Sequence, residues 1–361
     1  MVIFKFLIVL VLIEIVFRLF HYIKYKKNYF VSLKFKWNES HVTTHPFLSF
    51  SYKKNSVVNK NQKLPYPLHY NKFYSYKKPL NINNFGHFGD NFKTKKNKIR
   101  VMCLGASTTA NNISDGKRDY SYPKMLEEYL NKNSDKNYEV FNCGIGGWTS
   151  VDIFINFVLN LIKLSPDYVI LYHGYNDLHL YLMDDFQTDY QHGRKNLGEV
   201  IHKIKRAYLL PKIKFLHSYE FLKDKLFGTG NIRNDVLKLI TKNKINYTQE
   251  YGDLKHQSDI FENLIILCQN FNIKVLLSSF CHYNFDDSFE LSKIEKGINV
   301  ENNHMKNLSK KFNCDFVNQD KLIPKDDEHF VDSIHFTPSG MDKLAKNFGK
   351  VILSKRKKNG N

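Results

Sequence analysis

From residue 99 onward, short apolar segments alternate with segments whose apolar residues recur at helical spacing. The apolar segments predict strands at 99–104, 139–142, 168–172, 273–278 and 315–318. The segments between them predict helices at 122–130, 152–164, 260–271 and 338–353. Strands that alternate with helices are typical of a parallel sheet with helices on both faces. The sequence therefore predicts an α/β fold, in which ligands bind outside the carboxyl ends of the strands.

Two segments precede or interrupt this alternation. Residues 28–96 are polar and aromatic, contain several prolines, and are expected to form a connector of short strands and loops that packs on the main domain. The main domain is expected to span residues 97–361. Within it, residues 183–255 follow the third strand and carry basic amphipathic pieces. A structureless loop of this length is unusual in a compact domain, so a helical insertion near the site is expected.

The N-terminal residues 1–27 are expected to form a membrane anchor. Residues 2–20 are apolar except for Lys5, Glu14 and Arg18, and a helix of this length would span roughly 28 Å, close to the thickness of a hydrocarbon core. Tyrosines and lysines follow, and no small-x-small cleavage site is present, which favours an uncleaved single-pass anchor over a signal peptide. A buried amphipathic helix is the alternative.

The orientation of this anchor is open. The basic cluster after the apolar segment favours a cytoplasmic domain, whereas an exported domain would need the reverse arrangement. The formal net charge of +19 allows attraction to anionic lipid, anionic polysaccharide or nucleic acid. A bias towards lysine along the whole chain explains the charge more simply. No RNA-binding or helix-turn-helix signature accompanies it, so no nucleic acid partner is expected.

The cysteines predict neither a disulfide framework nor a metal site. The five cysteines are scattered and no C-x-x-C occurs. Cys103 and Cys143 lie at the ends of strand-like segments and are expected to be buried thiols. No metal and no organic cofactor is expected.

Ser107 is a candidate nucleophile at the end of the first predicted strand. Gly105 permits a tight turn there, and the following helix N-terminus directs backbone N–H groups towards the site. The alternative is that Ser107 and the threonines after it cap the helix.

Asp332 and His335 are candidates for the partners of this serine. Their three-residue spacing allows the carboxylate to reach Nδ1 of the imidazole while Nε2 faces a serine. A metal site with His329 and Asp327 is the alternative, but the spacing matches no common zinc signature.

Two further turns follow the second and third predicted strands. The first contains Gly144, Gly146 and Gly147, which permit positive φ angles and close approach of the backbone to a ligand. A nucleotide-phosphate loop is disfavoured because the G-x-G-x-x-G spacing is absent. The second turn contains Asn176, whose amide is able to donate to a developing oxyanion. A plain turn and an Asx turn are the alternatives.

These four segments, in this order, resemble the four blocks of the SGNH (GDSL-type) hydrolase superfamily over about residues 99–353. The resemblance implies a flavodoxin-like three-layer α/β/α sandwich. It also implies a catalytic triad and an oxyanion hole. The triad residues are Ser107, Asp332 and His335, and the oxyanion hole comprises Ser107, Gly147 and Asn176. Ala106 departs from the aspartate of the eponymous motif, a position that varies among relatives.

The resemblance implies a serine esterase that removes an acetyl or other short acyl group from an ester. The arrangement with an anchor is similar to hydrolase-like bacterial proteins associated with cell-surface polysaccharides, so an acylated carbohydrate is the expected substrate. An O-acyltransferase that passes the same acyl group to a glycan is an alternative. A non-catalytic glycan-binding or assembly protein on this fold is another, although the complete residue set argues against it. A phospholipase would fit a membrane location, but no acyl-chain groove is evident from the sequence.

Overall fold

The computed structural model describes residues 2–25, 42–58, 80–111, 119–183, 186–191, 254–285 and 288–358, and short pieces at 35–36, 113–114, 193, 212–213 and between 218 and 251. Its centre is a five-stranded sheet in which every strand pair is parallel, in the order β13-β12-β10-β6-β9. The strands are β6 (Ile99–Gly105), β9 (Tyr138–Gly144), β10 (Tyr168–Tyr172), β12 (Lys274–Ser278) and β13 (Asp315–Val317). Counted along the chain, this is the order of flavodoxin-like folds. The predicted α/β fold with a parallel sheet is confirmed.

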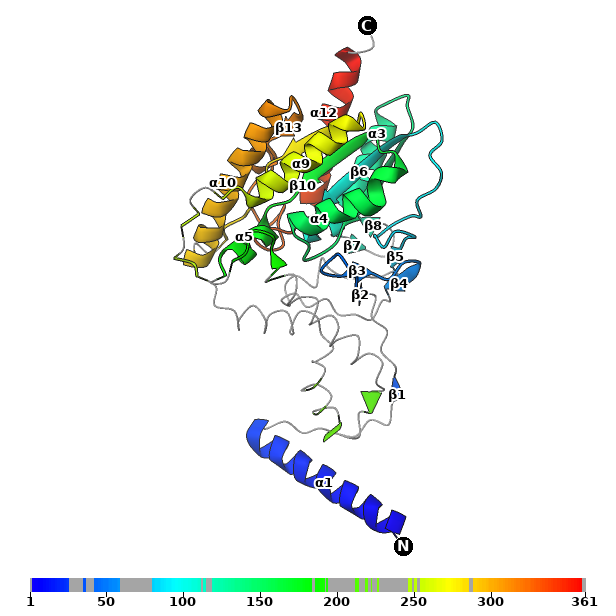
Figure 1. The fold of residues 1–361 in the computed structure, drawn as a ribbon, viewed down its shortest axis with the longest axis vertical. Coiled ribbons are helices and arrows are strands. Elements are labelled where there is room, and N and C mark those ends of the chain that lie inside the picture. Colours follow the sequence, from blue (N-terminus) through cyan, green and yellow to red (C-terminus); the bar gives the residue numbers. More distant parts are fainter. Residues whose placement is uncertain are drawn as a thin grey trace.

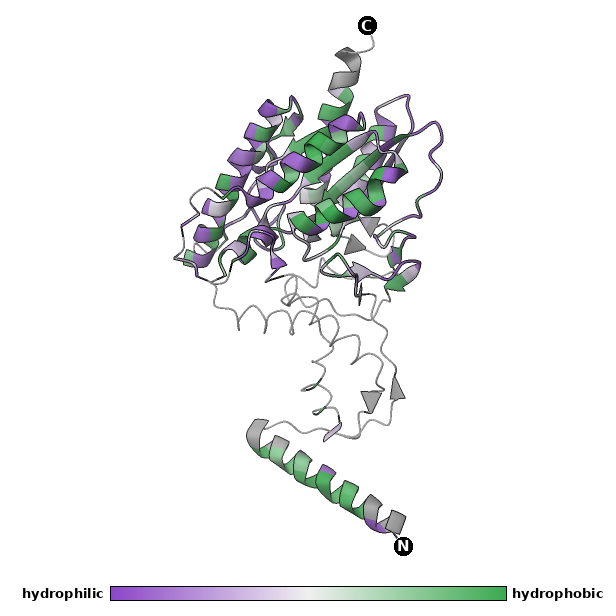
Figure 2. Ribbon diagram, viewed as in Figure 1, coloured by the Kyte–Doolittle hydropathy of each residue, from purple (hydrophilic) through white to green (hydrophobic). Residues whose placement is uncertain are grey.

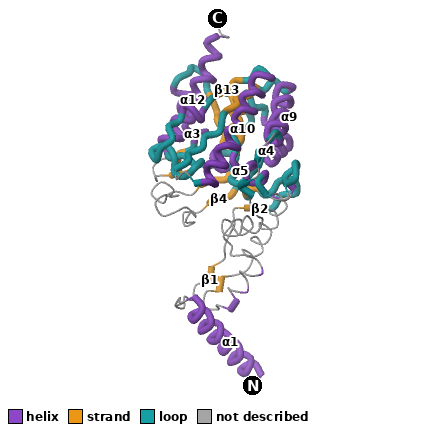
Figure 3. Tube along the Cα trace, turned by 90° about the vertical axis from the view of Figure 1, so that its left-hand side faces the viewer, coloured by secondary structure: helices purple, strands orange, loops and turns teal. Residues whose placement is uncertain are grey.

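Helices cover both faces of this sheet (Figure 1). One layer contains α3 (Tyr122–Lys132) and α12 (Pro338–Lys358), and the other contains α4 (Ser150–Asn156) and α9 (His256–Asn270), with α10 (Phe289–Lys311) packed beside α9. Figure 3 shows α3 and α12 on one side of the strands and α4 and α9 on the other. The sheet is therefore the middle layer of three.

The strand residues alternate between two hydrophobic cores because successive side chains of a strand point to opposite faces. On β6, Val101 and Cys103 pack with α3 and α12, whereas Met102 and Leu104 pack with α4 and α9. Figure 2 shows the strands as hydrophobic along most of their length. A strand that is covered on both faces buries nearly all of its side chains and is therefore rich in apolar residues. This is why these strands could be predicted from the sequence.

Short elements lie at the ends of the strands. They are α2 (Ser107–Ala110), β7 (Ile113–Ser114), β8 (Asp119–Tyr120), α5 (Tyr175–Tyr181) and α11 (Gln319–Leu322). Before the sheet, β2 (Val42–Thr43) pairs with β3 (Ser51–Tyr52), and β4 (Ser56–Val58) pairs with β5 (Leu80–Ile82), each antiparallel. A further antiparallel pair joins β1 (Phe35–Lys36) to β11 (Lys212–Ile213). Most of residues 183–255, the predicted helical insertion, lies outside the described residues, as do residues 59–79 of the predicted connector.

The prediction of a single-pass membrane anchor is wrong. Within the part of the chain that the structure describes, no helix combines the length and the apolar character that crossing a membrane requires. Helix α1 (Val2–Tyr25) contains Lys5, Glu14 and Arg18, and Arg18 forms an ion pair with Glu14 at 2.9 Å. The uninterrupted apolar run between Lys5 and Glu14 would span only about 12 Å of a hydrocarbon core of about 30 Å.

Helix α10 carries a buried acid, Glu301. Glu301 is 3% exposed, and neither oxygen of its carboxyl group has a hydrogen-bond partner in the described structure. Burial, and secondarily the nearby Asp177, raises the pKa of Glu301 well above its usual value. The folded chain therefore holds a proton on Glu301 that the unfolded chain releases above about pH 4.3.

We expect Glu301→Gln to stabilise the fold increasingly as the pH rises. In the natural chain, proton release from the unfolded state lowers the free energy of unfolding by about 1.4 kcal/mol per pH unit until the folded-state pKa is reached. Glutamine does not titrate, so this loss disappears. Urea unfolding of both chains at pH 5 and pH 8 measures the difference, with Glu290→Gln, exposed on the same helix, as the control. A stability difference that is independent of pH would contradict the prediction.

Candidate active site

Three of the predicted site residues follow the carboxyl ends of three neighbouring strands. Ser107 follows β6, Gly147 follows β9 and Asn176 follows β10, and β6 lies between the other two strands in the sheet. The backbone at Gly105 lies close to α2 and to β10: a Cβ atom placed there would lie 2.1 Å from Thr109 Oγ1 and 2.4 Å from Tyr172 O. Only glycine allows the chain to pass from β6 into α2 so close to β10.

Ser107, His335 and Asp332 form one continuous chain of contacts. The Oγ of Ser107 lies 2.9 Å from Nε2 of His335, and Nδ1 of His335 lies 2.8 Å from Oδ2 of Asp332. An ionised carboxylate only accepts hydrogen bonds, so Nδ1 donates to Asp332 and the Nε2 of a neutral ring accepts from the serine hydroxyl. The alternative in which Ser107 caps α2 is wrong, because the cap position is Ala106 and has no side-chain cap hydrogen bond.

Asp332 is held by the loop that carries it. Its Oδ1 accepts hydrogen bonds from the backbone N–H groups of Ile334, at 2.9 Å, and His335, at 2.7 Å. Burial raises the pKa of the Asp332 carboxyl, but the electrostatic interaction with His335 and the hydrogen bonds from its ring and from the two N–H groups outweigh burial and leave the pKa below its usual value. The carboxylate is therefore ionised at neutral pH and fixes the orientation of the imidazole ring.

The glycine turn and Asn176 are linked directly. Gly147 has a φ of 84°, a conformation that side-chain-bearing residues rarely adopt. The Asn176 Nδ2 donates a hydrogen bond of 2.7 Å to the carbonyl oxygen of Trp148. The amide carries a second N–H group in addition to this one. The turn after β9 and the first turn of α5 are thus held together by a direct hydrogen bond.

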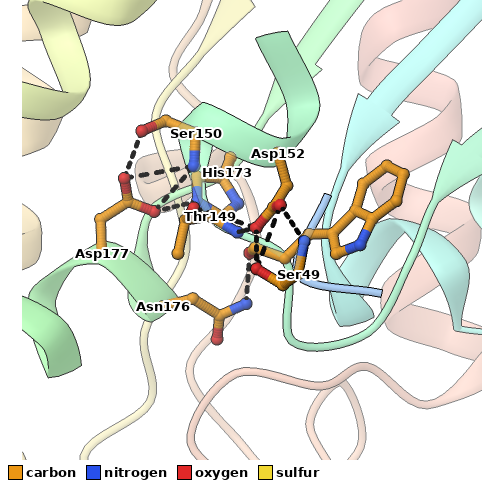
Figure 4. A network of polar contacts seen from close by, with 8 residues as sticks. Ser49, Thr149, Ser150, Asp152, His173, Asn176 and Asp177 are labelled. Carbon is orange, nitrogen blue, oxygen red and sulfur yellow. Dashed lines mark hydrogen bonds and ion pairs between the residues drawn. The ribbon is translucent and has the colours of Figure 1, made fainter. Parts of the chain in front are cut away.

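A buried polar network beside Asn176 reinforces this link (Figure 4). Asp177 accepts hydrogen bonds from the Ser150 N–H, at 3.1 Å to Oδ2, and from the Ser150 hydroxyl. Its Oδ2 also lies 2.5 Å from Nε2 of His173. His173 and Asp177 were not predicted as part of the site, although two titratable residues on either side of Asn176 in the sequence were a visible signal.

Ser150, Asp177 and His173 repeat the residue types of a triad but not its geometry. The serine contacts the carboxylate rather than the imidazole, and the three residues are 0%, 1% and 3% exposed. A nucleophile must reach its substrate, so this trio is a structural network and Ser107 is the accessible serine of the two.

The described residues contain no cluster of three or more His, Cys, Asp or Glu side chains able to hold a metal ion. His329, the histidine of the alternative metal site, instead places its Nδ1 2.6 Å from Oδ1 of Asp326. The five cysteines are free thiols, and Cys103 and Cys143 are buried as predicted.

The sequence is similar to one family of known proteins. The model of the GDSL-like Lipase/Acylhydrolase family matches residues 103–343. No curated protein matches the chain.

Several solved structures are similar over most of their length. An acetyl xylan esterase is 18% identical, covering 70% of this chain and 100% of its own, with a TM-score of 0.41. The lipase/acylhydrolase from Enterococcus faecalis is 13% identical, covering 71% of this chain and 96% of its own, with a TM-score of 0.43. An acetylxylan esterase from Geobacillus stearothermophilus is 14% identical, covering 70% and 94%, with a TM-score of 0.42.

Proposed function

The chain belongs to the GDSL-like lipase/acylhydrolase family and is a serine ester hydrolase, and from this premise we propose that Ser107 is its nucleophile, His335 its general base and Asp332 the residue that orients the base. The observation that supports these roles is the unbroken line of contacts from the serine hydroxyl to the ionised carboxylate, with separations of 2.9 Å and 2.8 Å. This is the order of contacts that nucleophilic catalysis by a serine requires.

In the first half of the proposed reaction, Nε2 of His335 takes the hydroxyl proton while Oγ of Ser107 bonds to the ester carbonyl carbon. The tetrahedral intermediate collapses as His335 returns the proton to the leaving alcohol, which leaves an acyl-enzyme on Ser107. In the second half, water gives its proton to His335 and attacks the acyl carbon. Collapse then releases the carboxylic acid and restores the Ser107 hydroxyl.

The negative charge of both intermediates is proposed to lie between three donors. They are the backbone N–H groups of Ser107 and Gly147 and the side-chain amide of Asn176. The link from Asn176 to Trp148, at 2.7 Å, supports this role because it fixes the amide before substrate arrives. Donors that are already oriented stabilise a developing oxyanion without further reorganisation, and the loss of one costs about 10²–10³ in rate.

We propose an acetyl or other short acyl ester on a carbohydrate as the substrate. The support is membership of the GDSL-like lipase/acylhydrolase family, which is an argument from family. The formal net charge of +19 would favour a carrier that bears negative charge.

The test is a panel of esters that separates the acyl group from its carrier. We expect p-nitrophenyl acetate to have a kcat/KM at least about tenfold above that of the octanoate, because a pocket shaped for a short acyl group rejects a long one. Acetylated neutral and anionic oligosaccharides, compared at equal acetyl concentration, then report on the carrier. Equal turnover of acetate and octanoate would overturn the short-acyl assignment. Acetyl transfer to an added glycan in place of acetate release would indicate an acyltransferase.

A further inference from the structure

Part of the N-terminal segment packs against the glycine turn of the proposed oxyanion hole. Residues 42–58 precede the range 103–343 that the family model matches. Even so, the carbonyl oxygen of Phe50 accepts a 3.0 Å hydrogen bond from Nε1 of Trp148. The ring of Phe50 would also lie 3.8 Å from a Cβ atom placed on Gly147. Strand β3 and the residues just before it therefore border the turn that carries the Gly147 N–H.

A buried carboxylate fixes the same segment to the first turn of α4. The Oδ1 of Asp152 accepts a 2.9 Å hydrogen bond from the Ser49 N–H, and its Oδ2 accepts one of 2.9 Å from the Ser49 hydroxyl. Asp152 also accepts hydrogen bonds from the N–H and hydroxyl of Thr149, at 3.3 Å and 3.2 Å (Figure 4). Since Asp152 is fully buried, these contacts hold the two segments in one register.

The Tyr52 hydroxyl approaches Ser107 across Gly146. A Cβ atom placed on Gly146 would lie 3.8 Å from the Tyr52 hydroxyl oxygen and 3.6 Å from Cβ of Ser107. Gly146 is thus the spacer between the phenol and the candidate nucleophile. A Cβ atom at Gly146 would be in ordinary van der Waals contact with both side chains, so the two lie on either side of this one residue.

The Tyr52 hydroxyl is able to act as a fixed hydrogen-bond acceptor for a backbone N–H group of the glycine turn. Burial raises the pKa of Tyr52 to about 12, and a hydrogen bond from the Gly146 backbone opposes that rise. The phenol is therefore neutral and accepts the Gly146 N–H. Its ring is held by Phe88, with ring centroids 5.1 Å apart, and its backbone pairs with Val42.

We propose that Tyr52 is a positioning residue for ester hydrolysis: its hydroxyl binds the Gly146 N–H and thereby aims the next peptide N–H, that of Gly147, at the oxyanion beside Ser107. This inference rests on the proposed function. It extends the functional unit back to the Ser49–Tyr52 segment, which the family model does not include. Tyr52 does not itself touch the reacting atoms.

The test is Tyr52→Phe, which removes the hydroxyl and keeps the ring. The matched control is Tyr138→Phe, because Tyr138 is also buried, at 2% exposed, but stands at the amino end of β9, away from the site. For p-nitrophenyl acetate we expect kcat of Tyr52→Phe to fall by about tenfold to a hundredfold with KM within about twofold, because the aim of one oxyanion donor is lost. The rate at which a fluorophosphonate labels Ser107 should fall with kcat. The control should keep both rates.

The outcomes separate this inference from the function on which it rests. Rates are compared at a temperature where circular dichroism shows each chain folded, and failure of Tyr52→Phe to fold at any temperature would assign Tyr52 a structural role and overturn the inference. An unchanged kcat and labelling rate in folded Tyr52→Phe would overturn it alone. Absence of both turnover and labelling in the unaltered chain would overturn the proposed function as well.

Discussion

Replacement of Ser107 by alanine is expected to lower kcat for ester hydrolysis by at least about 10⁴-fold while KM and thermal stability change little. The hydroxyl that would form the acyl-enzyme is removed, and what is left is the residual catalysis of the oxyanion donors and of substrate binding. The mutation removes one oxygen whose partner is Nε2 of His335, at 2.9 Å, and it leaves the helix-forming backbone of α2 intact. Initial rates with p-nitrophenyl acetate, together with a thermal melt, measure both quantities.

The control for this variant is Ser134→Ala. Ser134 lies in the connection between α3 and β9, where its hydroxyl accepts a 3.1 Å hydrogen bond from the Lys136 N–H, at the amino end of the strand and away from the site. Its kcat should equal that of the unaltered chain. Retention of more than about one hundredth of kcat in folded Ser107→Ala would show that another group attacks the ester.

The layered fold was predictable because its strands are buried on both faces. The continuous apolar runs at 101–105 and Tyr168–Tyr172 have the length of buried strands rather than of helices. The predicted helix at 152–164 is helical but not uniform, since α4 is followed by a π-helical turn at Phe157–Leu161 and a 3₁₀ turn at Ile162–Leu164. Over only a few residues, the α-, π- and 3₁₀-helical conformations share the same spacing of apolar residues. The sequence pattern could therefore not distinguish them.

Helix α10 escaped prediction for a different reason. Its inward face includes Lys293, Gly297 and Glu301, all buried, so polar residues and a glycine interrupt the apolar stripe by which helices are recognised. The prediction of a membrane helix failed for a related reason. Most residues of α1 are apolar, but the charged residues among them shorten its uninterrupted apolar run. In both segments the position of each charged residue indicates the structure better than the overall composition does.

The candidate site was predictable to the extent that its residues sit at strand ends. The sheet order places the ends of β9, β6 and β10 side by side, which brings Gly147, Ser107 and Asn176 together. Contacts from outside the alternation were not predictable. Nothing in the local sequence of Ser49 or Tyr52 indicates that these side chains meet a turn about a hundred residues away, because that depends on tertiary packing.

Replacement of Asp332 by asparagine is expected to lower kcat by about 10³–10⁴-fold with the loop preserved. Asparagine keeps one oxygen, which is able to accept from the N–H groups of Ile334 and His335 as Oδ1 does now, at 2.9 Å and 2.7 Å. Its amide would face Nδ1 of His335, however, and an amide donates where the carboxylate accepts. The ring would then carry its proton on Nε2, which could no longer take the proton of Ser107.

The chain supplies a matched control in a second Asp-x-x-His pair. Asp326 and His329 have the same three-residue spacing, with Oδ1 and Nδ1 2.6 Å apart, but His329 has no described contact with Ser107. Asp326→Asn should keep kcat within about threefold, since the tautomer of His329 plays no part in the proposed proton transfer. Equal losses in the two variants would mean that the effect comes from loop stability. A loss confined to Asp332→Asn, with the rate of fluorophosphonate labelling reduced in step, would place the loss in the activation of Ser107, because labelling requires the same proton transfer but no deacylation.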